Sequence, residues 1–299
     1  MAAEKMHADE VDIDAGLVRR LLAAQFPQWA DLPVAAVPSA GTVNAIYRLG
    51  DAMAVRLPRV QQYARDLEKE YEWLPRLAPH LPLAIPEPLA MGMPGEGYEW
   101  RWGIYRWLKG EIWATNDVRD LREAADDLAR FISALRGIDT AGAPRRAVGY
   151  DTLAAHEYVR PAIAAAAGLI DVDAANAAWD AALDLPAWDG TRVWVHGDLS
   201  RPSNLLVVEG RLSAVIDFGA IILGDPAREL MAAWTLFSGE SRDAFRRALS
   251  VDDATWARGR AWTLTRVMNV AYSAETNPAI VAEARHAIDE VLADRVHDL

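Results

Sequence analysis

The chain has 299 residues, 52% of them hydrophobic, which is enough for one large domain or two smaller ones built around a core. It contains no cysteine, so disulfides, cysteine-ligated zinc and thiol nucleophiles are excluded. The formal net charge is −12 and the arginines form no dense block, which argues against nucleic acid as a partner. Without the apolar pattern of a signal peptide or a membrane span, the sequence predicts a soluble, cytoplasmic protein with no membrane partner.

The first third of the sequence alternates between helix-like and strand-like patterns. Asp14 stands where it would cap a helix with one apolar face, and Gly50-Asp51 is a tight-turn dipeptide between two β-like runs. Further on, alternation around Trp100 and Trp102 predicts a half-buried strand. The expected elements are a helix from Asp14, a hairpin of strands over 42–49 and 52–57, a helix over 63–77 and a strand over 99–107.

After Leu108-Lys109-Gly110 the sequence pattern changes and predicts long helices rich in alanine, leucine and arginine, the first over 117–136. Three short β-like runs interrupt them between 192 and 224, and helix resumes with Asp225 as a cap and Pro226 in the first helical position. The three runs are 193–195, 205–208 and 212–216, the last two joined by the turn Glu209-Gly210. We therefore predict an α+β fold with two lobes, 1–107 containing a β-sheet and 108–299 mainly helical.

Three polar side chains stand next to the ends of these short runs: Asp198, Asn204 and Asp217. Phosphoryl transfer needs one group to orient the attacking hydroxyl and accept its proton, and oxygen ligands to hold magnesium. A carboxylate, an amide and a second carboxylate supply that set. Each piece alone is a weak signal, but their order along the chain favours a kinase.

These segments resemble the aminoglycoside phosphotransferase and choline kinase family, which is related to the protein kinases. The resemblance rests on Gly41-Thr42-Val43-Asn44, Val55-Arg56-Leu57, Glu70 with Trp73-Leu74, Tyr105-Arg106-Trp107-Leu108, Val195-His196-Gly197-Asp198, Ile216-Asp217-Phe218-Gly219 and Gly224-Asp225-Pro226-Ala227. It implies a protein-kinase-like fold, with 1–107 as the nucleotide-binding lobe and 108–299 as the catalytic and substrate-binding lobe. It also implies ATP or GTP as the phosphoryl donor.

By residue, the resemblance assigns Asp198 as the catalytic base, and Asn204 and Asp217 as the ligands of Mg²⁺. His196 then serves as a structural residue of the catalytic loop. Ala220 follows Asp217-Phe218-Gly219 where close relatives often carry another acidic residue, so one polar contact is missing.

On the nucleotide side, the family places a strand lysine that holds phosphate and pairs with a helix glutamate. This sequence has Arg56 at the matching position and Glu70 as its natural partner. Arginine is always charged and binds phosphate as a fork, so the function could survive; the alternative is that Arg56 pairs with a surface carboxylate. A loop containing Ser39, Gly41, Thr42 and Asn44 is expected to close over the phosphates.

The catalytic loop departs from the family pattern in length. Six positions separate Asp198 from Asn204, whereas the pattern has five. We expect Pro202 to set a local turn that bulges the surplus residue outward, so that both side chains still converge on the phosphate site, with Ser200 and Arg201 projecting toward solvent or the acceptor. The alternative is a displaced base and a slower enzyme.

Two classes of function follow. The first is an O-phosphotransferase acting on a hydroxylated small molecule, and the negative net charge is compatible with a cationic one. The acceptor would be an aminoglycoside antibiotic in a resistance-type reaction, or alternatively a macrolide or an amino-sugar-like metabolite. The second is a nucleotide-binding protein with weak or no transferase activity, suggested by Arg56 and the longer loop. Retention of Asp198, Asn204 and Asp217 together favours the enzyme.

Overall fold

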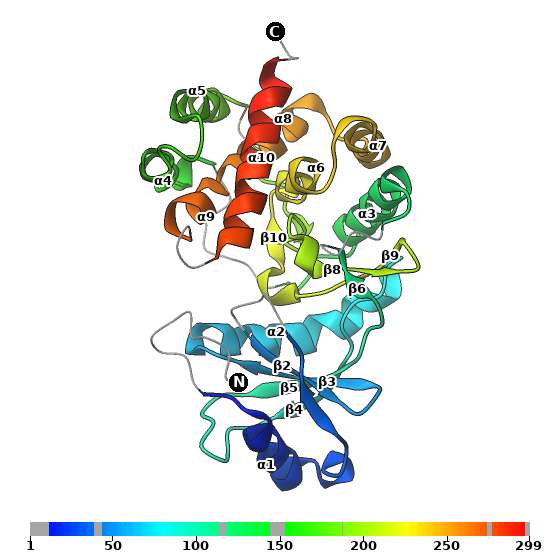
Figure 1. Ribbon diagram of the computed structural model, residues 1–299. Helices are drawn as coiled ribbons and strands as arrows, with labels where there is room; N and C mark the ends of the chain where they lie inside the picture. Colours follow the sequence, from blue (N-terminus) through cyan, green and yellow to red (C-terminus); the bar gives the residue numbers. More distant parts are fainter. Residues whose placement is uncertain are drawn as a thin grey trace. The chain divides into compact units, whose positions relative to one another are not determined.

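The computed structural model describes residues 12–38, 44–113, 118–143, 153–186, 188–273 and 277–296. The chain divides into two compact units: unit 1 is Met1–Gly110 with Ala214–Ala220, and unit 2 is Glu111–Ser213 with Ile221–Leu299. Unit 1 contains a five-stranded sheet and unit 2 is mainly helical (Figure 1). This confirms the predicted α+β class, whereas the division at residue 107 stays a prediction. No helix among the described residues has the length and apolarity to cross a membrane.

Unit 1 is built on an antiparallel sheet in the order β1-β2-β3-β5-β4. The predicted hairpin is confirmed in its described part, where Leu49 pairs with Met53 around Gly50, whose φ is +56°. That left-handed conformation suits glycine at a tight turn. The strands are β1 (Val34–Ala36), β2 (Asn44–Leu49), β3 (Met53–Pro58), β4 (Pro88–Gly92) and β5 (Trp102–Arg106).

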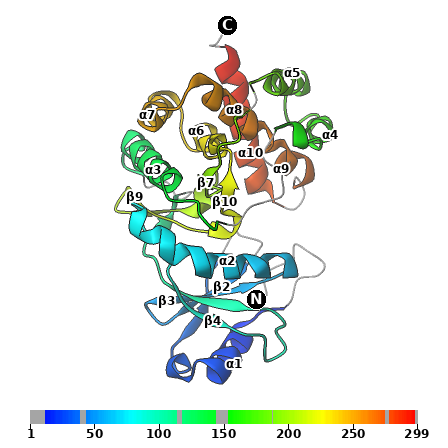
Figure 2. The same cartoon turned by 180° about the vertical axis from the view of Figure 1, so that it is seen from behind.

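Helices α1 (Ala15–Gln25) and α2 (Gln61–Leu77) cover opposite faces of this sheet (Figures 1 and 2). Asp14 caps α1 as predicted, because its Oδ1 accepts a hydrogen bond of 2.7 Å from the backbone N–H of Leu17. The alternation predicted over 99–107 is wrong: β5 begins at Trp102 and its first four residues are all buried. A strand covered on both faces cannot show the half-buried pattern.

Unit 2 is mainly helical, with two small sheets, β7-β10 and β6-β8-β9. The hairpin β8-β9 turns at Glu209-Gly210, as predicted, with φ of +50° and +79°. The first helix begins at Leu121 with Asp120 as its cap, and position 117 of the predicted range lies outside the described residues. The helices are α3 (Leu121–Arg136), α4 (Val159–Ala165), α5 (Val172–Leu183), α6 (Ala232–Thr235), α7 (Gly239–Leu249), α8 (Asp253–Leu264), α9 (Val267–Tyr272) and α10 (Pro278–Val296); the strands are β6 (Glu111–Ile112), β7 (Val193–Val195), β8 (Leu205–Val208), β9 (Arg211–Val215) and β10 (Ile222–Gly224).

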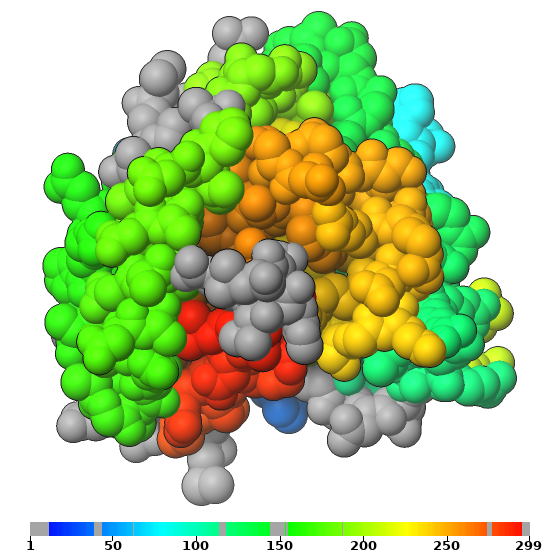
Figure 3. Space-filling view, turned by 90° about the horizontal axis from the view of Figure 1, so that it is seen from above, coloured from blue at the N-terminus to red at the C-terminus, as the bar shows by residue number. Residues whose placement is uncertain are grey.

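Helix α10 contacts α5, α6, α8 and α9, and Figure 3 shows it in red between the green α4 and α5 and the yellow to orange α6–α8. One close approach fixes α8 against the 3₁₀ segment η7 (Pro226–Met231): a Cβ added at Gly259 would lie 2.4 Å from Cβ of Leu230.

The helix predicted after Asp225 is present, but its first part is not the α-helix that was expected. The chain first forms 3₁₀ turns and becomes α-helical at Ala232.

Candidate active site

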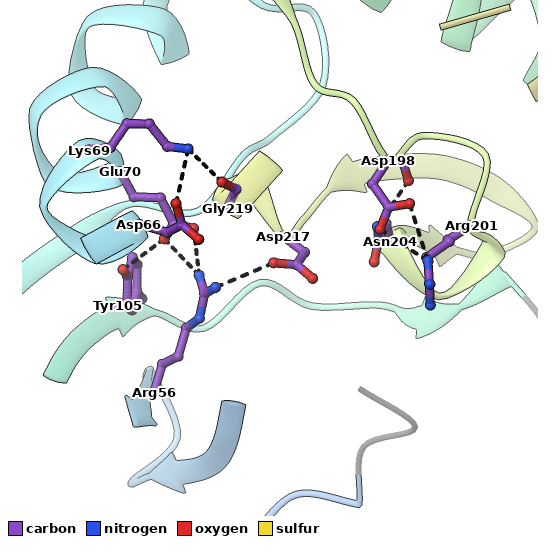
Figure 4. A network of polar contacts seen from close by, with 10 residues as sticks. All are labelled: Arg56, Asp66, Lys69, Glu70, Tyr105, Asp198, Arg201, Asn204, Asp217 and Gly219. Atoms are coloured by element: carbon purple, nitrogen blue, oxygen red, sulfur yellow. Dashed lines mark hydrogen bonds and ion pairs between the residues drawn. The ribbon is translucent and has the colours of Figure 1, made fainter. Parts of the chain in front are cut away.

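Arg56 forms a buried ion pair with Glu70 in unit 1, and Glu70 is the partner that the sequence predicted for it. Arg56 lies on the face of β3 that α2 covers, and its Nη1 donates to both carboxylate oxygens of Glu70 at 2.7 Å (Figure 4). The Arg56 side chain is 14% exposed and the Glu70 side chain 1% exposed. The alternative that Arg56 pairs only with a surface carboxylate is wrong, because this partner is buried.

Two further side chains accept hydrogen bonds from the same guanidinium. The amide oxygen of Asn44, oriented toward Arg56, accepts from Nε at 3.0 Å and from Nη2 at 2.9 Å. Oδ1 of Asp217 accepts from Nη2 at 3.3 Å. Asp217 has a φ of +64°, a left-handed conformation that aspartate tolerates better than most residues. Each nitrogen of Arg56 therefore has an acceptor within unit 1.

The electrostatics of this cluster favour a permanently charged arginine. Burial alone would lower the pKa of Arg56, but the carboxylates of Glu70 and Asp217 and the Tyr105 oxygen outweigh it and hold the pKa above its ordinary value. The Tyr105 hydroxyl donates to Oε2 of Glu70 at 2.9 Å, and burial raises its own pKa well above the ordinary value. Tyr105 thus completes the hydrogen bonding of Glu70 as a neutral donor.

Lys69 is a residue of this cluster that sequence reasoning missed. Its Nζ donates to the backbone carbonyl of Gly219 at 2.5 Å and pairs with Asp66 at 3.2 Å (Figure 4). Lys69 therefore fastens the turn after Asp217 to α2, next to Glu70. Two features of the sequence could have identified Lys69. It is one of only three lysines in the chain, and it directly precedes the helix glutamate.

Asp198 lies in unit 2, just after β7, in a loop shaped by Gly197 and His196. Gly197 has a φ of +84°, and Nδ1 of the fully buried His196 accepts from the backbone N–H of Asp198 at 3.3 Å. This contact agrees with the structural role expected for His196. The Asp198 side chain remains 31% exposed, so the backbone is held while the carboxylate stays accessible.

Asn204 meets Asp198 in spite of the longer loop. Its Nδ2 donates to the backbone carbonyl of Asp198 at 3.0 Å and to Oδ2 of the Asp198 carboxylate at 3.1 Å (Figure 4). The surplus residue is absorbed by a 3₁₀ turn, η5 (Pro202–Asn204), which starts at the proline as predicted. The two side chains thus contact each other, and their convergence on a phosphate site stays a prediction.

The expectation that Ser200 projects outward is wrong. Ser200 is 5% exposed, and its hydroxyl accepts a 2.8 Å hydrogen bond from Nη1 of the buried Arg266. Arg201 is partly exposed, but it folds back onto Asp198, with Nε at 3.1 Å from Oδ2. Arg266 thus supplies the hydrogen-bond partner that a buried hydroxyl requires.

Glu229 anchors the catalytic loop, and the sequence reasoning assigned it no role. Its side chain is 1% exposed, and Oε1 accepts from the backbone N–H of Gly197 at 2.8 Å. Burial raises the pKa of Glu229, opposed by the backbone N–H groups of Gly197 and His196 and by Arg136. In the described part of the chain, Oε2 of Glu229 and Nε of Arg136 are buried without hydrogen-bond partners. Only its place in the segment after Gly224-Asp225-Pro226 could have signalled this anchor.

Asp225 has a structural role at the start of the same segment. It is 1% exposed; Oδ1 accepts from the backbone N–H of Ala227 at 2.9 Å, which confirms the predicted cap. Oδ2 accepts from Nε of Arg258 at 3.2 Å and from the indole of Trp262 at 3.4 Å. These bonds tie η7 to α8 and so fix the segment that carries Glu229.

The proposed magnesium ligands offer suitable oxygen atoms. The amide nitrogen of Asn204 is held by Asp198, which leaves the amide oxygen as the donor atom. The Asp217 side chain is 46% exposed and only its Oδ1 contacts Arg56, so a carboxylate oxygen remains for a hard cation. Among the described residues no group of three or more His, Asp or Glu side chains is arranged to bind a metal. A magnesium ion held by either oxygen would draw its other ligands from nucleotide phosphates and water.

The predicted site residues thus fall into two groups, one in each unit. Unit 1 brings together Arg56, Glu70, Asn44 and Asp217, and unit 2 brings together Asp198 and Asn204. Ser39, Gly41 and Thr42 of the expected phosphate loop lie outside the described residues. Their role stays a prediction.

Solved structures with a similar fold include antibiotic phosphotransferases. The GDP complex of wild-type aminoglycoside 2′-phosphotransferase-IIIa has a TM-score of 0.72 and 19% identity, covering 95% of this chain and 100% of that chain. A GDP and kanamycin complex of an APH(2″) enzyme gives 0.72 and 20%, covering 94% and 99%. Macrolide 2′-phosphotransferase MphH from Brachybacterium faecium gives 0.62 and 21%, covering 92% and 98%. These likenesses confirm the predicted kinase-like fold.

A search of curated protein sequences found no match to the chain. The match to a family model is extensive, however, because it spans residues 34–262, from β1 into α8, and includes both groups of predicted site residues. The chain therefore belongs to the phosphotransferase enzyme family.

Proposed function

We propose that this protein transfers the γ-phosphoryl group of ATP or GTP to a hydroxyl of a small molecule, with an aminoglycoside as the first candidate acceptor. The observation that carries the proposal is the Asp198–Asn204 pair: an accessible carboxylate held at 3.1 Å from an amide whose oxygen is free to bind a cation. Family membership and the GDP, ADP, ATP and kanamycin complexes of the structural neighbours support it.

In this proposal Asp198 orients the acceptor hydroxyl and takes its proton as the oxygen attacks phosphorus. His196 and Glu229 hold the backbone of the loop, while Asn204 and Arg201 contact the carboxylate oxygens themselves. Arg56, supported by Glu70, supplies a fixed positive charge for the phosphates. Mg²⁺, held by Asn204 and Asp217, would neutralise phosphate charge when bound.

Phosphate binding at Arg56 requires an exchange of partners. Its nitrogens are all engaged, and the two contacts to Glu70 are short and buried. The longer contact of 3.3 Å to the half-exposed Asp217 is the one most easily given up. Once Asp217 turns to a cation, Nη2 of Arg56 is free to donate to a phosphate oxygen.

A macrolide is the second candidate acceptor, favoured by the likeness to macrolide 2′-phosphotransferases with TM-scores of 0.62. A net charge of −12 favours a cationic acceptor, whose attraction salt screens over roughly 8–10 Å. Weaker acceptor binding at higher salt, with nucleotide affinity followed in parallel, would support the cationic class.

The test is a screen of the purified protein with ATP and with GTP against aminoglycosides, macrolides and amino sugars, in which nucleoside diphosphate release and the acceptor mass are both measured. We expect diphosphate release that depends on one acceptor class and a phosphorylated acceptor of the corresponding mass. Nucleotide binding without any acceptor phosphorylation would favour the binding-protein hypothesis instead.

A further inference from the structure

Arg201 contacts the carboxylate of Asp198 from within the lengthened loop. Its Nε lies 3.2 Å from Oδ1 and 3.1 Å from Oδ2, and the Arg201 side chain is 35% exposed (Figure 4). Within the part of the chain that the structure describes, the two Nη groups of Arg201 have no hydrogen-bond acceptor. A guanidinium with several unused donors thus stands beside the carboxylate that the proposed function makes the base.

A second arginine lies behind the same loop. Arg266 is 6% exposed, donates to Ser200, the residue before Arg201, and has a buried Nε without an acceptor among the described residues. Burial lowers the pKa of Arg266, the charge of Arg201 adds to that effect, and Asp198 and Glu283 oppose it. The two guanidiniums therefore repel each other across the loop. An additional anion beside Asp198 would relieve that repulsion.

We propose that Arg201 binds the phosphoryl group during transfer, which deepens the proposed function and rests on it. The acceptor oxygen forms its bond to the γ-phosphorus while its proton passes to the Asp198 carboxylate. The bond from phosphorus to the bridging oxygen breaks, and its electron pair leaves with the nucleoside diphosphate. Protonation removes the negative charge of Asp198, so Arg201 loses its counter-ion at the step when the phosphoryl oxygens require a cation.

This role also accounts for the surplus residue. The 3₁₀ turn at Pro202 keeps Asn204 on Asp198, and Ser200 is fixed by Arg266. Between these two fixed points, Arg201 is the side chain left partly exposed next to the base. The longer loop therefore adds a cation to the site without displacing the amide.

The rival accounts make different predictions. If the Arg201–Asp198 contact were only a structural ion pair, removal of Arg201 would change stability but not affinity for a phosphoryl mimic. If Arg201 recognised an acidic group of the acceptor, its removal would raise the KM of acidic acceptors alone. The phosphoryl role predicts a loss that is independent of the acceptor's charge.

The experiment compares wild type, Arg201→Ala, Arg201→Gln and Arg201→Lys, with Arg211→Ala as the matched control. Arg211 lies in the same unit, is 58% exposed and pairs with Glu123 at 2.5 Å. Affinities for ADP and GDP with magnesium are measured by calorimetry with and without aluminium fluoride, which mimics the transferred phosphoryl group. Acceptor kinetics and thermal melting are measured on the same samples.

We expect the affinity of each variant for ADP or GDP alone to stay within about twofold of wild type. The increase in affinity that aluminium fluoride causes should fall about 10²-fold in Arg201→Ala and Arg201→Gln, as for loss of one oxyanion donor. Arg201→Lys should keep part of this increase in affinity, and the control Arg211→Ala should keep all of it. A full gain in a folded Arg201 variant overturns the proposal, as does a selective KM effect for acidic acceptors. A wild type that binds nucleotide but shows neither the gain nor transfer overturns the proposed function as well.

Discussion

The two groups of site residues differ in how their charged side chains are buried and held. In unit 1, Arg56 is paired side chain to side chain with a carboxylate that is 1% exposed, and every nitrogen of the guanidinium has an acceptor. In unit 2, the backbone around Asp198 is held by His196 and Glu229, while its carboxylate is 31% exposed. The first arrangement fixes a charge in place, and the second leaves a charge available.

The difference indicates where each group tolerates change. A buried ion pair is costly to break because the remaining charge is left without compensation. A carboxylate whose loop is positioned through backbone bonds can lose its charge without loss of the fold. We therefore expect substitutions in unit 1 to act mainly on stability, and substitutions at Asp198 to act mainly on rate.

The largest effect on rate is expected for Asp198→Asn. Loss of the base should lower kcat about 10²- to 10⁴-fold, because an amide cannot accept the proton, while nucleotide affinity and melting temperature stay close to those of wild type. Steady-state kinetics and calorimetry check this. Asp243→Asn, at an exposed position of α7, is the control. A variant that retains more than about a tenth of the turnover would remove Asp198 from the role of base.

Glu70→Ala should cause the largest loss of stability. It leaves the buried Arg56 charge with only the longer ion pair of 3.3 Å to the half-exposed Asp217, which costs about 3–5 kcal/mol in free energy of unfolding. Urea unfolding measures the change. Glu87→Ala is the matched control, since Glu87 pairs with Arg106 on the surface of the same unit and its loss should leave the unfolding midpoint nearly unchanged. Equal unfolding midpoints for the two variants would show that burial of the Arg56–Glu70 pair does not affect the free energy of unfolding.

Glu229→Ala tests the backbone anchor in unit 2. The Gly197 N–H loses its buried acceptor and Arg136 its nearby charge, so we expect a loss of about 1–3 kcal/mol in stability. A shift of the loop by about 1 Å would lower kcat about 10²-fold with little change in nucleotide affinity. Glu229→Gln keeps an oxygen acceptor and should recover much of the turnover. If both variants lost nucleotide affinity instead, the anchor would not act through Asp198.

The smallest effect is expected for Arg56→Lys. Lysine keeps one charge opposite Glu70 but cannot bond Glu70, Asn44 and Asp217 together, so stability should fall by less than in Glu70→Ala. Nucleotide affinity and turnover should change only a few-fold if the position serves phosphate binding. Calorimetric titration with nucleotide separates this from Arg56→Ala, which should weaken both properties together. Unchanged affinity in the alanine variant would place the phosphate-binding charge elsewhere.

Local turn and cap signals predicted much of the fold. Gly50-Asp51 and Glu209-Gly210 stand at the observed hairpin turns, and Asp14 caps α1, because these signals act through neighbouring backbone groups. The burial of Trp102 through Tyr105 was not predictable from alternation, since it depends on two helices covering both faces of the sheet. The 3₁₀ start of the segment after Asp225 likewise carries no local signal.

At the site, the sequence predicted which residue types pair but not how the pairs are supported. The Arg56–Glu70 contact and the proximity of Asp198 to Asn204 were expected, whereas the roles of Lys69 and Glu229 emerged only from the structure. Both of the missed residues bond to backbone atoms far away in the sequence, which no local pattern records. The burial of Ser200 depends in the same way on Arg266, 66 positions further along the chain.

The most direct test of the central claim follows the fate of the γ-phosphoryl group by phosphorus NMR, with wild type and Asp198→Asn given the acceptor selected by the screen. The account predicts that a phosphomonoester of the acceptor appears at the rate of nucleoside diphosphate formation in wild type, and about 10²- to 10⁴-fold more slowly in the variant. Formation of inorganic phosphate alone, or equal ester formation by both proteins, would contradict it.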